Sequence, residues 1–149
     1  MSQPREAIAD LVHLYAERID AGDFAGVGAL FADAAILGPD GTPVARGADE
    51  ARRLYERTTR RYEDGTPRTK HVTSNLIVEV DGGGEEARAR SYFTVFQAVP
   101  GALALQPIVA GRYHDVFARS GDTWRFRERR MFVDLVGELG RHLLVTLGG

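Results

Sequence analysis

The first third of the chain has the hydrophobic spacing of amphipathic helices. Apolar side chains recur three and four positions apart near the N-terminus, which predicts one helix with a single buried face. The residues of that face are Ile8, Leu11, Val12, Tyr15 and Ile19. Gly22 is expected to end this helix, and Asp23 can cap a second, shorter one.

The next segments indicate short elements separated by turns. Residues 34–37 read as a short buried strand, and the Gly- and Pro-rich segment that follows reads as turns around a small hairpin. A third helix is predicted over residues 48–61, because small and apolar residues again recur at helical spacing.

From residue 68 onward the hydrophobic period changes from helical to alternating. Short turns separate four long segments that read as strands, and such turns favour an antiparallel meander. The four segments are residues 68–80, 86–99, 107–120 and 123–135. Gly111, inside the third of them, predicts a bulge or a sharp bend. For residues 136–149 the pattern leaves two alternatives open, a short helix or an extra strand.

Helices that precede a run of strands indicate the α+β class. A chain of 149 residues fits one domain, so we predict a single domain over residues 1–149. A long, strongly curved sheet wrapped over a few helices would make a cone, and the mouth of a cone is a favourable place for a ligand.

Composition narrows the classes of function. The net charge of −2 gives no reason to expect nucleic-acid or membrane binding, and no apolar run is long enough to span a membrane. The chain has no cysteine, which excludes disulfides, thiolate chemistry and cysteine metal sites. The charged N-terminus does not have the pattern of a signal peptide. We therefore predict a cytoplasmic protein.

Four segments resemble the SnoaL-like branch of the nuclear-transport-factor-2-like superfamily. They are "LYAERIDAGDFAGVGALFADAAIL", "GADEARRLYE", "KHVTSNLIVEV" and "GRYHDVFARSGDTWRFRERR". The resemblance implies a cone-shaped α+β barrel in which the helices pack inside a mainly antiparallel curved sheet. The superfamily contains ketosteroid isomerases, polyketide cyclases, scytalone and bile-acid dehydratases, a lindane dehydrochlorinase, and members that only bind ligands.

The resemblance also implies a set of catalytic residues. The dehydratases and the dehydrochlorinase use a polar residue on the first helix and an aspartate five positions later. They also use a histidine that opens the first long strand and an arginine that follows a W-x-F motif. In this chain those positions are Tyr15, Asp20, His71 and Arg129.

Two positions depart from the family pattern. The base of the ketosteroid isomerases would fall at Gly38 or Pro39, neither of which can take a proton. Some dehydratases carry a further acid or histidine on the second long strand, where this chain has only Ser91, Tyr92 and Thr94 as polar residues. The mechanism of the ketosteroid isomerases, which needs that base, is therefore not expected.

The residue types suit proton abstraction beside a carbonyl. Histidine is the usual base because its pKa lies near neutral pH, and an aspartate bonded to its other ring nitrogen fixes the tautomer. Tyr15 and Arg129 could donate hydrogen bonds to a developing oxyanion or a leaving group. This chemistry needs no cofactor, and no pair of histidines has the spacing of metal ligands, so neither a cofactor nor a metal is predicted.

Strict alternation conflicts with two of these assignments. It places His71 with Thr73 and Glu79, opposite the more apolar set, and it places Arg129 with Arg125. Because a one-residue slip reverses the face of a strand, each assignment requires a bulge nearby. Without such bulges His71 is a surface histidine. Each of the other two residues also has an interpretation without a catalytic role. Asp20 would be a solvated carboxylate at a helix end, and Tyr15 would only pack in the core.

Large apolar side chains are expected to line the pocket and to bind a hydrophobic, ring-containing small molecule. The candidates are Phe31, Tyr55, Tyr92, Phe96, Tyr113 and Phe132. The other histidines, at positions 13, 114 and 142, are given no role.

Three hypotheses of function remain open. The first is a cofactor-independent lyase, dehydratase or isomerase that uses an Asp–His pair. The second is a non-catalytic small-molecule-binding or oligomerisation module. The third is a polyketide-cyclase-like aldol catalyst. Each is expected to form a homodimer or homotrimer through the sheet face, because apolar residues occur on both faces of the strands.

Overall fold

A computed structural model describes residues 3–146 and places three helices and six strands among them. The helices are α1 (Pro4–Asp20), α2 (Phe24–Leu30) and α3 (Gly47–Thr58). The strands are β1 (Ala35–Leu37), β2 (Pro43–Arg46), β3 (Thr69–Val80), β4 (Glu86–Val99), β5 (Leu103–Ser120) and β6 (Thr123–Val136). The predicted α+β class is confirmed.

The helix α1 forms where the apolar spacing predicted it. Pro4 occupies its first turn, where a missing backbone N–H does no harm, and the predicted stripe faces the core. Gly22 follows in the left-handed conformation, with φ of 73°, which ends the helix. The Asp23 side chain then accepts a hydrogen bond from the backbone N–H of Gly26 and caps α2. None of the described helices combines the length and apolarity needed to cross a membrane.

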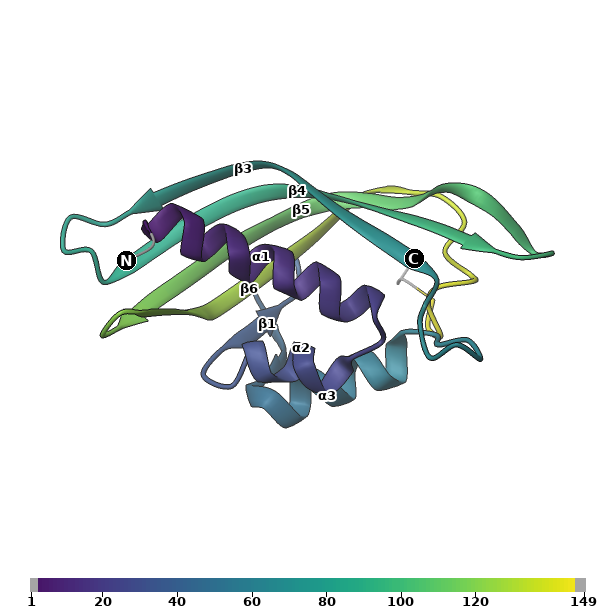
Figure 1. Cartoon of the computed structure of the whole chain (residues 1–149), viewed down its shortest axis with the longest axis horizontal. Coiled ribbons are helices and arrows are strands. Elements are labelled where there is room, and N and C mark those ends of the chain that lie inside the picture. The colour runs from purple at the N-terminus through teal and green to yellow at the C-terminus, as the bar shows by residue number, and fades with distance from the viewer. Residues whose placement is uncertain (1–2, 147–149) are drawn as a thin grey trace.

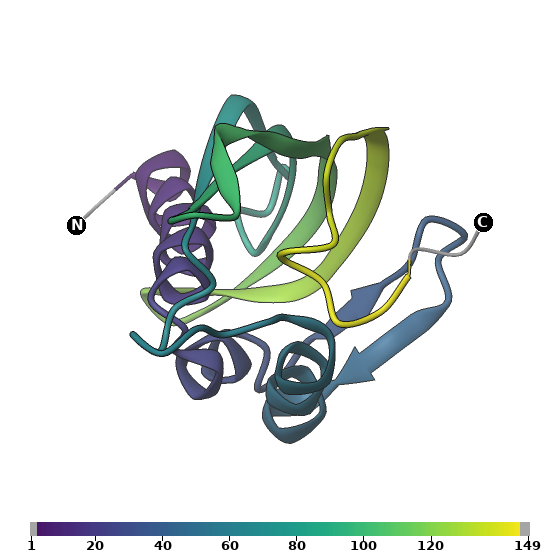
Figure 2. The same ribbon diagram turned by 90° about the vertical axis from the view of Figure 1, so that its right-hand side faces the viewer.

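The six strands form one curved sheet in the order β2-β1-β6-β5-β4-β3. The last four strands pair with their sequence neighbours in an antiparallel meander, as predicted, whereas β1 pairs parallel to β6. Figure 1 shows α1 lying along the sheet, with α2 and α3 below it, on the side away from the sheet. Figure 2 shows the sheet curving around α1, which is the predicted cone.

Gly111 lies at a point of close backbone approach. The pairing of β5 with β6 shifts register between Ala110 and Gly111, which confirms the predicted irregularity. A Cβ atom at this position would lie 1.9 Å from the carbonyl oxygen of Phe132 and 2.7 Å from the Phe93 ring. Only glycine therefore fits here.

Three predictions about the bounds and type of elements differ from the structure. The strand β5 begins at Leu103 rather than at residue 107. The helix α3 ends at Thr58 rather than at Arg61, because Thr59 is extended and forms an isolated bridge with Leu143. Residues 137–146 form neither of the two predicted elements. They form a turn that runs back to the end of α3, and residues 147–149 lie outside the described part. In Figure 2 this tail crosses in front of the cone.

Candidate active site

The structure joins Asp20, the last residue of α1, to His71 near the start of β3. His71 Nδ1 lies 2.7 Å from Asp20 Oδ1, and the His71 backbone N–H donates to Asp20 Oδ2 at 2.8 Å. The Thr69 hydroxyl also donates to Oδ1, at 2.8 Å. Only 10% of the Asp20 side chain and 8% of the His71 side chain are exposed. These bonds hold the carboxylate at a helix C-terminus, where the helix dipole disfavours a negative charge.

A bulge in β3 turns His71 towards α1. The pairing of β3 with β4 shifts register between Ser74 and Ile77, and Asn75 has a φ of 54°. Before the bulge His71 and Thr73 are the more buried residues, and after it Leu76 and Val78 are. The extra residue therefore resolves the conflict between strict alternation and an inward-facing histidine.

A second bulge, on β6, turns the Arg129 side chain towards the inside of the cone. Phe117 pairs with Phe126 and Val116 pairs with Glu128, which leaves one extra residue between the two pairs. Phe126 and Arg129 are consequently both buried although they are three residues apart. Arg129 thus lies inside the cone.

Arg129 forms a fully buried ion pair with Asp115 of β5. Its Nε lies 2.8 Å from Asp115 Oδ1 and its Nη2 lies 2.9 Å from Oδ2, a bidentate arrangement. The guanidinium also stacks 3.6 Å above the Tyr113 ring and 4.4 Å above the Tyr15 ring. Burial opposes its charge, but the Asp115 carboxylate raises the pKa of Arg129 above its ordinary value, so the guanidinium stays charged. Its Nη1 has no hydrogen-bond partner among the described residues.

Tyr15 lies in the same buried cluster as Arg129. Its hydroxyl is 2.5 Å from the Tyr55 hydroxyl, and its ring packs edge-on against Phe31 and Tyr113. Burial raises the pKa of both Tyr15 and Tyr55, so both phenols remain protonated at neutral pH. Within residues 3–146 no hydrogen bond joins this cluster to the Asp20–His71 pair.

Comparison with known proteins identifies the family. The sequence signature of the SnoaL-like domain matches residues 2–130, which is nearly the whole chain. The chain belongs to the SnoaL-like family. No curated protein matches the chain.

Solved structures share the fold of this SnoaL-like chain. Rv3472, a Mycobacterium tuberculosis protein of unknown function, is 27% identical over 89% of this chain and 72% of its own, with a TM-score of 0.70. A Nostoc punctiforme protein of unknown function with a cystatin-like fold is 22% identical, over 93% and 97% of the two chains, with a TM-score of 0.73. A candidate scytalone dehydratase from Novosphingobium aromaticivorans is 20% identical, over 91% and 93%, with a TM-score of 0.68.

Three of the predicted pocket residues lie inside the SnoaL-like cone. Phe31, Tyr55 and Tyr113 are all buried. Phe31 stacks on Phe126 at 5.0 Å, and Tyr113 stacks on Phe93 at 4.5 Å. These rings belong to the hydrophobic core that surrounds Arg129.

The other three lie on the outer face of the sheet, so their assignment to an internal pocket needs correction. Tyr92 is 53% exposed, and Phe96 lies on the same face of β4, opposite the buried Phe93. Phe132 packs against the exposed His114 ring, at 4.8 Å. Alternation within β4 and β6 turns these aromatic residues outward because their neighbours fill the inner face.

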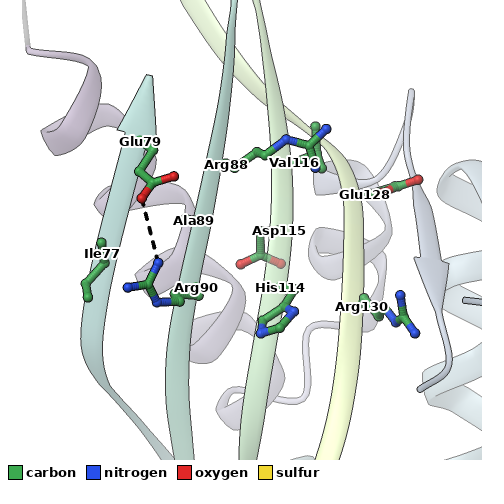
Figure 3. A pocket seen from close by; sticks show the side chains of 10 residues that line it. All are labelled: Ile77, Glu79, Arg88, Ala89, Arg90, His114, Asp115, Val116, Glu128 and Arg130. Carbon is green, nitrogen blue, oxygen red and sulfur yellow. Dashed lines mark ion pairs between the residues drawn. The ribbon is translucent and has the colours of Figure 1, made fainter. Parts of the chain in front are cut away.

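Two of the grooves on the SnoaL-like surface differ in their relation to the Asp–His pair. One, of about 370 Å³, lies between α1 and β3 and includes Asp20 and His71 in its wall, beside His13, Glu17 and Lys70. Asp20 and His71 therefore lie at the surface of this groove. The other, of about 320 Å³, lies on the outer sheet face and is drawn in Figure 3. Its charged walls include a surface ion pair between Glu79 and Arg90, and it does not reach the pair.

The hydrophobic pattern gave no role to His142, which the structure places beside His71. Its side chain comes from the tail after β6, is 7% exposed as a residue, and has its ring centroid 6.3 Å from that of His71. The signature match ends at residue 130, so the family resemblance does not reach this position. A lone histidine in a segment without clear periodicity carries no signal that places it at the site.

Burial of His142 should make stability depend on pH. Burial, and next the His71 ring, lower the pKa of His142 to about 4, against about 6.5 in an unfolded chain. Between those values the unfolded chain holds the proton more tightly, so acid favours unfolding. From pH 7 to pH 4 the free energy of unfolding should fall by about 3 kcal/mol more in the wild type than in His142→Phe. Urea denaturation at a series of pH values measures this difference.

His13→Gln is the matched control for that measurement. His13 is exposed on α1, so its replacement should leave the pH dependence of unfolding unchanged. A His142→Phe variant that loses stability in acid as steeply as the wild type would contradict the prediction.

Proposed function

We propose that this SnoaL-like protein is a cofactor-independent lyase or isomerase that removes a proton from a carbon next to a carbonyl in a hydrophobic, ring-containing molecule. The observation that carries the proposal is the hydrogen bond between Asp20 and the buried His71 ring. A carboxylate bonded to one nitrogen of a buried histidine leaves the other nitrogen free to act as a base.

The bonds around Asp20 support a role for each atom. Asp20 Oδ1 accepts a hydrogen bond from His71 Nδ1, which keeps the proton of the neutral ring on Nδ1 and leaves Nε2 as the base. When Nε2 takes the substrate proton, the carboxylate stabilises the imidazolium that forms. Thr69 and the His71 backbone N–H hold the carboxylate in place, so the ring is positioned before the substrate arrives.

The buried Tyr15 and Arg129 are the proposed donors to negative charge that develops on the substrate. Tyr15 remains a phenol, and Arg129 Nη1 is the guanidinium terminus that Asp115 leaves free. A permanent charge in a dry interior stabilises an enolate strongly. The likeness to a candidate scytalone dehydratase supports elimination of water as the overall reaction.

Deuterium exchange tests the proposal on simple carbonyl compounds. The protein is incubated in D₂O with a panel of cyclic ketones and β-hydroxy ketones, and NMR follows exchange at the α-carbon and loss of water. We expect exchange or elimination with the wild type and its loss in Asp20→Asn. Ligand binding without turnover across the panel would favour the alternative, a non-catalytic binding module. Aldol cyclisation of a poly-carbonyl compound, incubated beside the panel, would favour the third hypothesis.

The tautomer of His71 provides a second readout for Asp20→Asn. In the wild type, ¹⁵N spectra of the neutral ring should show the proton on Nδ1, because the Asp20 carboxylate can only accept. The asparagine amide can also donate, so the variant should show a mixture of tautomers. Identical spectra for both proteins would count against the Asp–His pair.

We also propose that a second copy, or two, of this chain covers the outer sheet face. Val72, Thr94, Ala110 and Leu135 form one row across four strands, and Val72 and Leu135 are 47% and 71% exposed. Tyr92 lies in the next row. Such a row, apolar except for Thr94, is typical of an interface.

Sedimentation should therefore show a homodimer or homotrimer. Leu135→Arg should shift the protein to the monomer, because it would place a charge in the interface. Val44→Arg is the matched control, since Val44 is 47% exposed on β2, away from this face. A wild-type monomer at the concentration of the assay would contradict the proposal.

A further inference from the structure

The tail after β6 holds His142 in place through backbone atoms. The His142 N–H donates to the Leu139 carbonyl at 3.0 Å, and its carbonyl accepts from the Arg60 N–H at 2.8 Å. Two residues further on, Leu144 N–H donates to the Thr58 carbonyl. The fold therefore fixes the position of His142 without using the polar atoms of its side chain.

The neighbouring Arg141 ties the tail to the inner face of the sheet. Its carbonyl accepts hydrogen bonds from the buried Gln97 side chain of β4, at 2.9 Å, and from the Tyr62 hydroxyl, at 2.5 Å. Gln97 also donates to the Pro67 carbonyl, just before β3. These hydrogen bonds fix the tail as part of the cone wall, beside His71.

Three buried polar atoms in this part of the wall have no partner among the described residues. They are His142 Nδ1, Gln97 Oε1 and Arg60 Nε. All three residues are linked by the hydrogen bonds to Arg141 and His142 given above. A buried polar atom without a partner costs about 1–3 kcal/mol, so such an atom in a folded protein calls for a partner such as ordered water or a bound molecule.

We propose that His142 contacts the ligand and that its Nδ1 makes a hydrogen bond to a hydroxyl or carbonyl oxygen on the ring compound whose proton His71 takes. The inference rests on the proposed function and makes it more specific. The nine-tenths burial of His142, its free Nδ1 and its 6.3 Å distance from the His71 ring carry the inference.

The charges around His142 favour an uncharged oxygen. The lowered pKa of His142, about 4, keeps its ring neutral at pH 7, and the Asp20 carboxylate is close enough to raise that pKa slightly. A ligand carboxylate would meet the Asp20 charge without a cation to offset it. A neutral imidazole can donate to a carbonyl or accept from a hydroxyl.

Two probes of nearly equal shape test the contact. 2-Naphthol carries one hydroxyl, and 2-methylnaphthalene replaces it with a methyl group of similar size. Fluorescence titration gives the Kd of each probe for the wild type and for His142→Phe, which keeps an aromatic ring and removes both nitrogens. We expect 2-naphthol to bind the wild type about tenfold more tightly, the worth of one buried hydrogen bond, and this preference to vanish in His142→Phe.

Two further variants separate recognition from folding. His142→Gln keeps a polar group and should retain part of the preference, and His114→Gln, on the outer face of the sheet, should retain all of it. Circular dichroism confirms that each variant folds. An unchanged preference in His142→Phe would overturn the inference, as would failure of both probes to bind the wild type.

The same titration distinguishes this inference from the proposed function. Binding requires no turnover, so a preference that depends on His142 would stand even if Asp20→Asn left deuterium exchange intact. Conversely, exchange that depends on Asp20 together with a preference that ignores His142 would overturn only the contact proposed here.

Discussion

His71→Gln should lower kcat/KM by about 10²–10⁴ on any compound that the wild type turns over. Glutamine has nearly the reach of histidine, but its amide does not take a proton near neutral pH, so the variant loses the base. The backbone N–H of residue 71 still donates to Asp20, so the strand and the helix end should stay joined. Steady-state kinetics on the most reactive compound of the exchange panel measures the loss.

An exposed histidine provides a matched control for that experiment. His114 lies on the opposite face of the sheet, in the groove that does not reach the Asp–His pair. His114→Gln should retain wild-type kcat/KM within about threefold, the range usual for distant surface changes. A His71→Gln variant as active as His114→Gln would eliminate His71 as the base.

Arg129→Met should lower the free energy of unfolding by about 3–5 kcal/mol, the usual result of removing one partner of a buried ion pair. The reason is Asp115, whose carboxylate is fully buried and receives two hydrogen bonds from Arg129. Without the guanidinium that carboxylate is left uncompensated in the core. Loss of the stacking on Tyr15 and Tyr113 adds to the effect. Denaturation in urea at pH 7 provides the measurement.

A double variant separates the ion pair from packing. Arg129→Met with Asp115→Leu removes both charges and should recover most of the lost stability, because an apolar pair avoids the desolvation of two ions. Arg125→Met is the surface control, since its partner Asp33 and Arg125 itself are both mostly exposed, and it should change stability little. Equal effects of Arg125→Met and Arg129→Met would refute the argument.

The hydrophobic pattern was sufficient for the elements because each period reflects a local geometry. The stripe of α1 and the strands β4 and β6 appear where the helical and alternating periods predicted them. Gly22 and Gly111 marked a helix end and a register shift for steric reasons that act within a few residues. The end of α3 and the path of the tail were not predictable in this way, because each depends on the bridge between Thr59 and Leu143.

The sequence predicted only part of the candidate site. The resemblance gave Asp20 and His71, yet alternation alone turned His71 to solvent. A bulge at Asn75 turns the His71 side chain inward, and no local sequence motif predicts this bulge. The prediction of pocket residues was wrong for Tyr92 and Phe96, which have the size expected of pocket walls but lie on the outer face. Apolar residues occupy both faces of β4, so the hydrophobic pattern does not show which face is inside.

The sequence by itself determined the order of helices and strands, the family, and the residue types available for proton transfer, since these depend on periodicity and on short motifs. The tertiary structure decided which side chains meet. It paired Arg129 with Asp115 and placed the tail histidine His142 beside His71. Bulges in β3 and β6 turned the side chains of His71 and Arg129 towards the inside of the cone. The physical reason is that one added residue reverses a strand's face, and contacts between segments far apart in the chain depend on how the whole sheet curves.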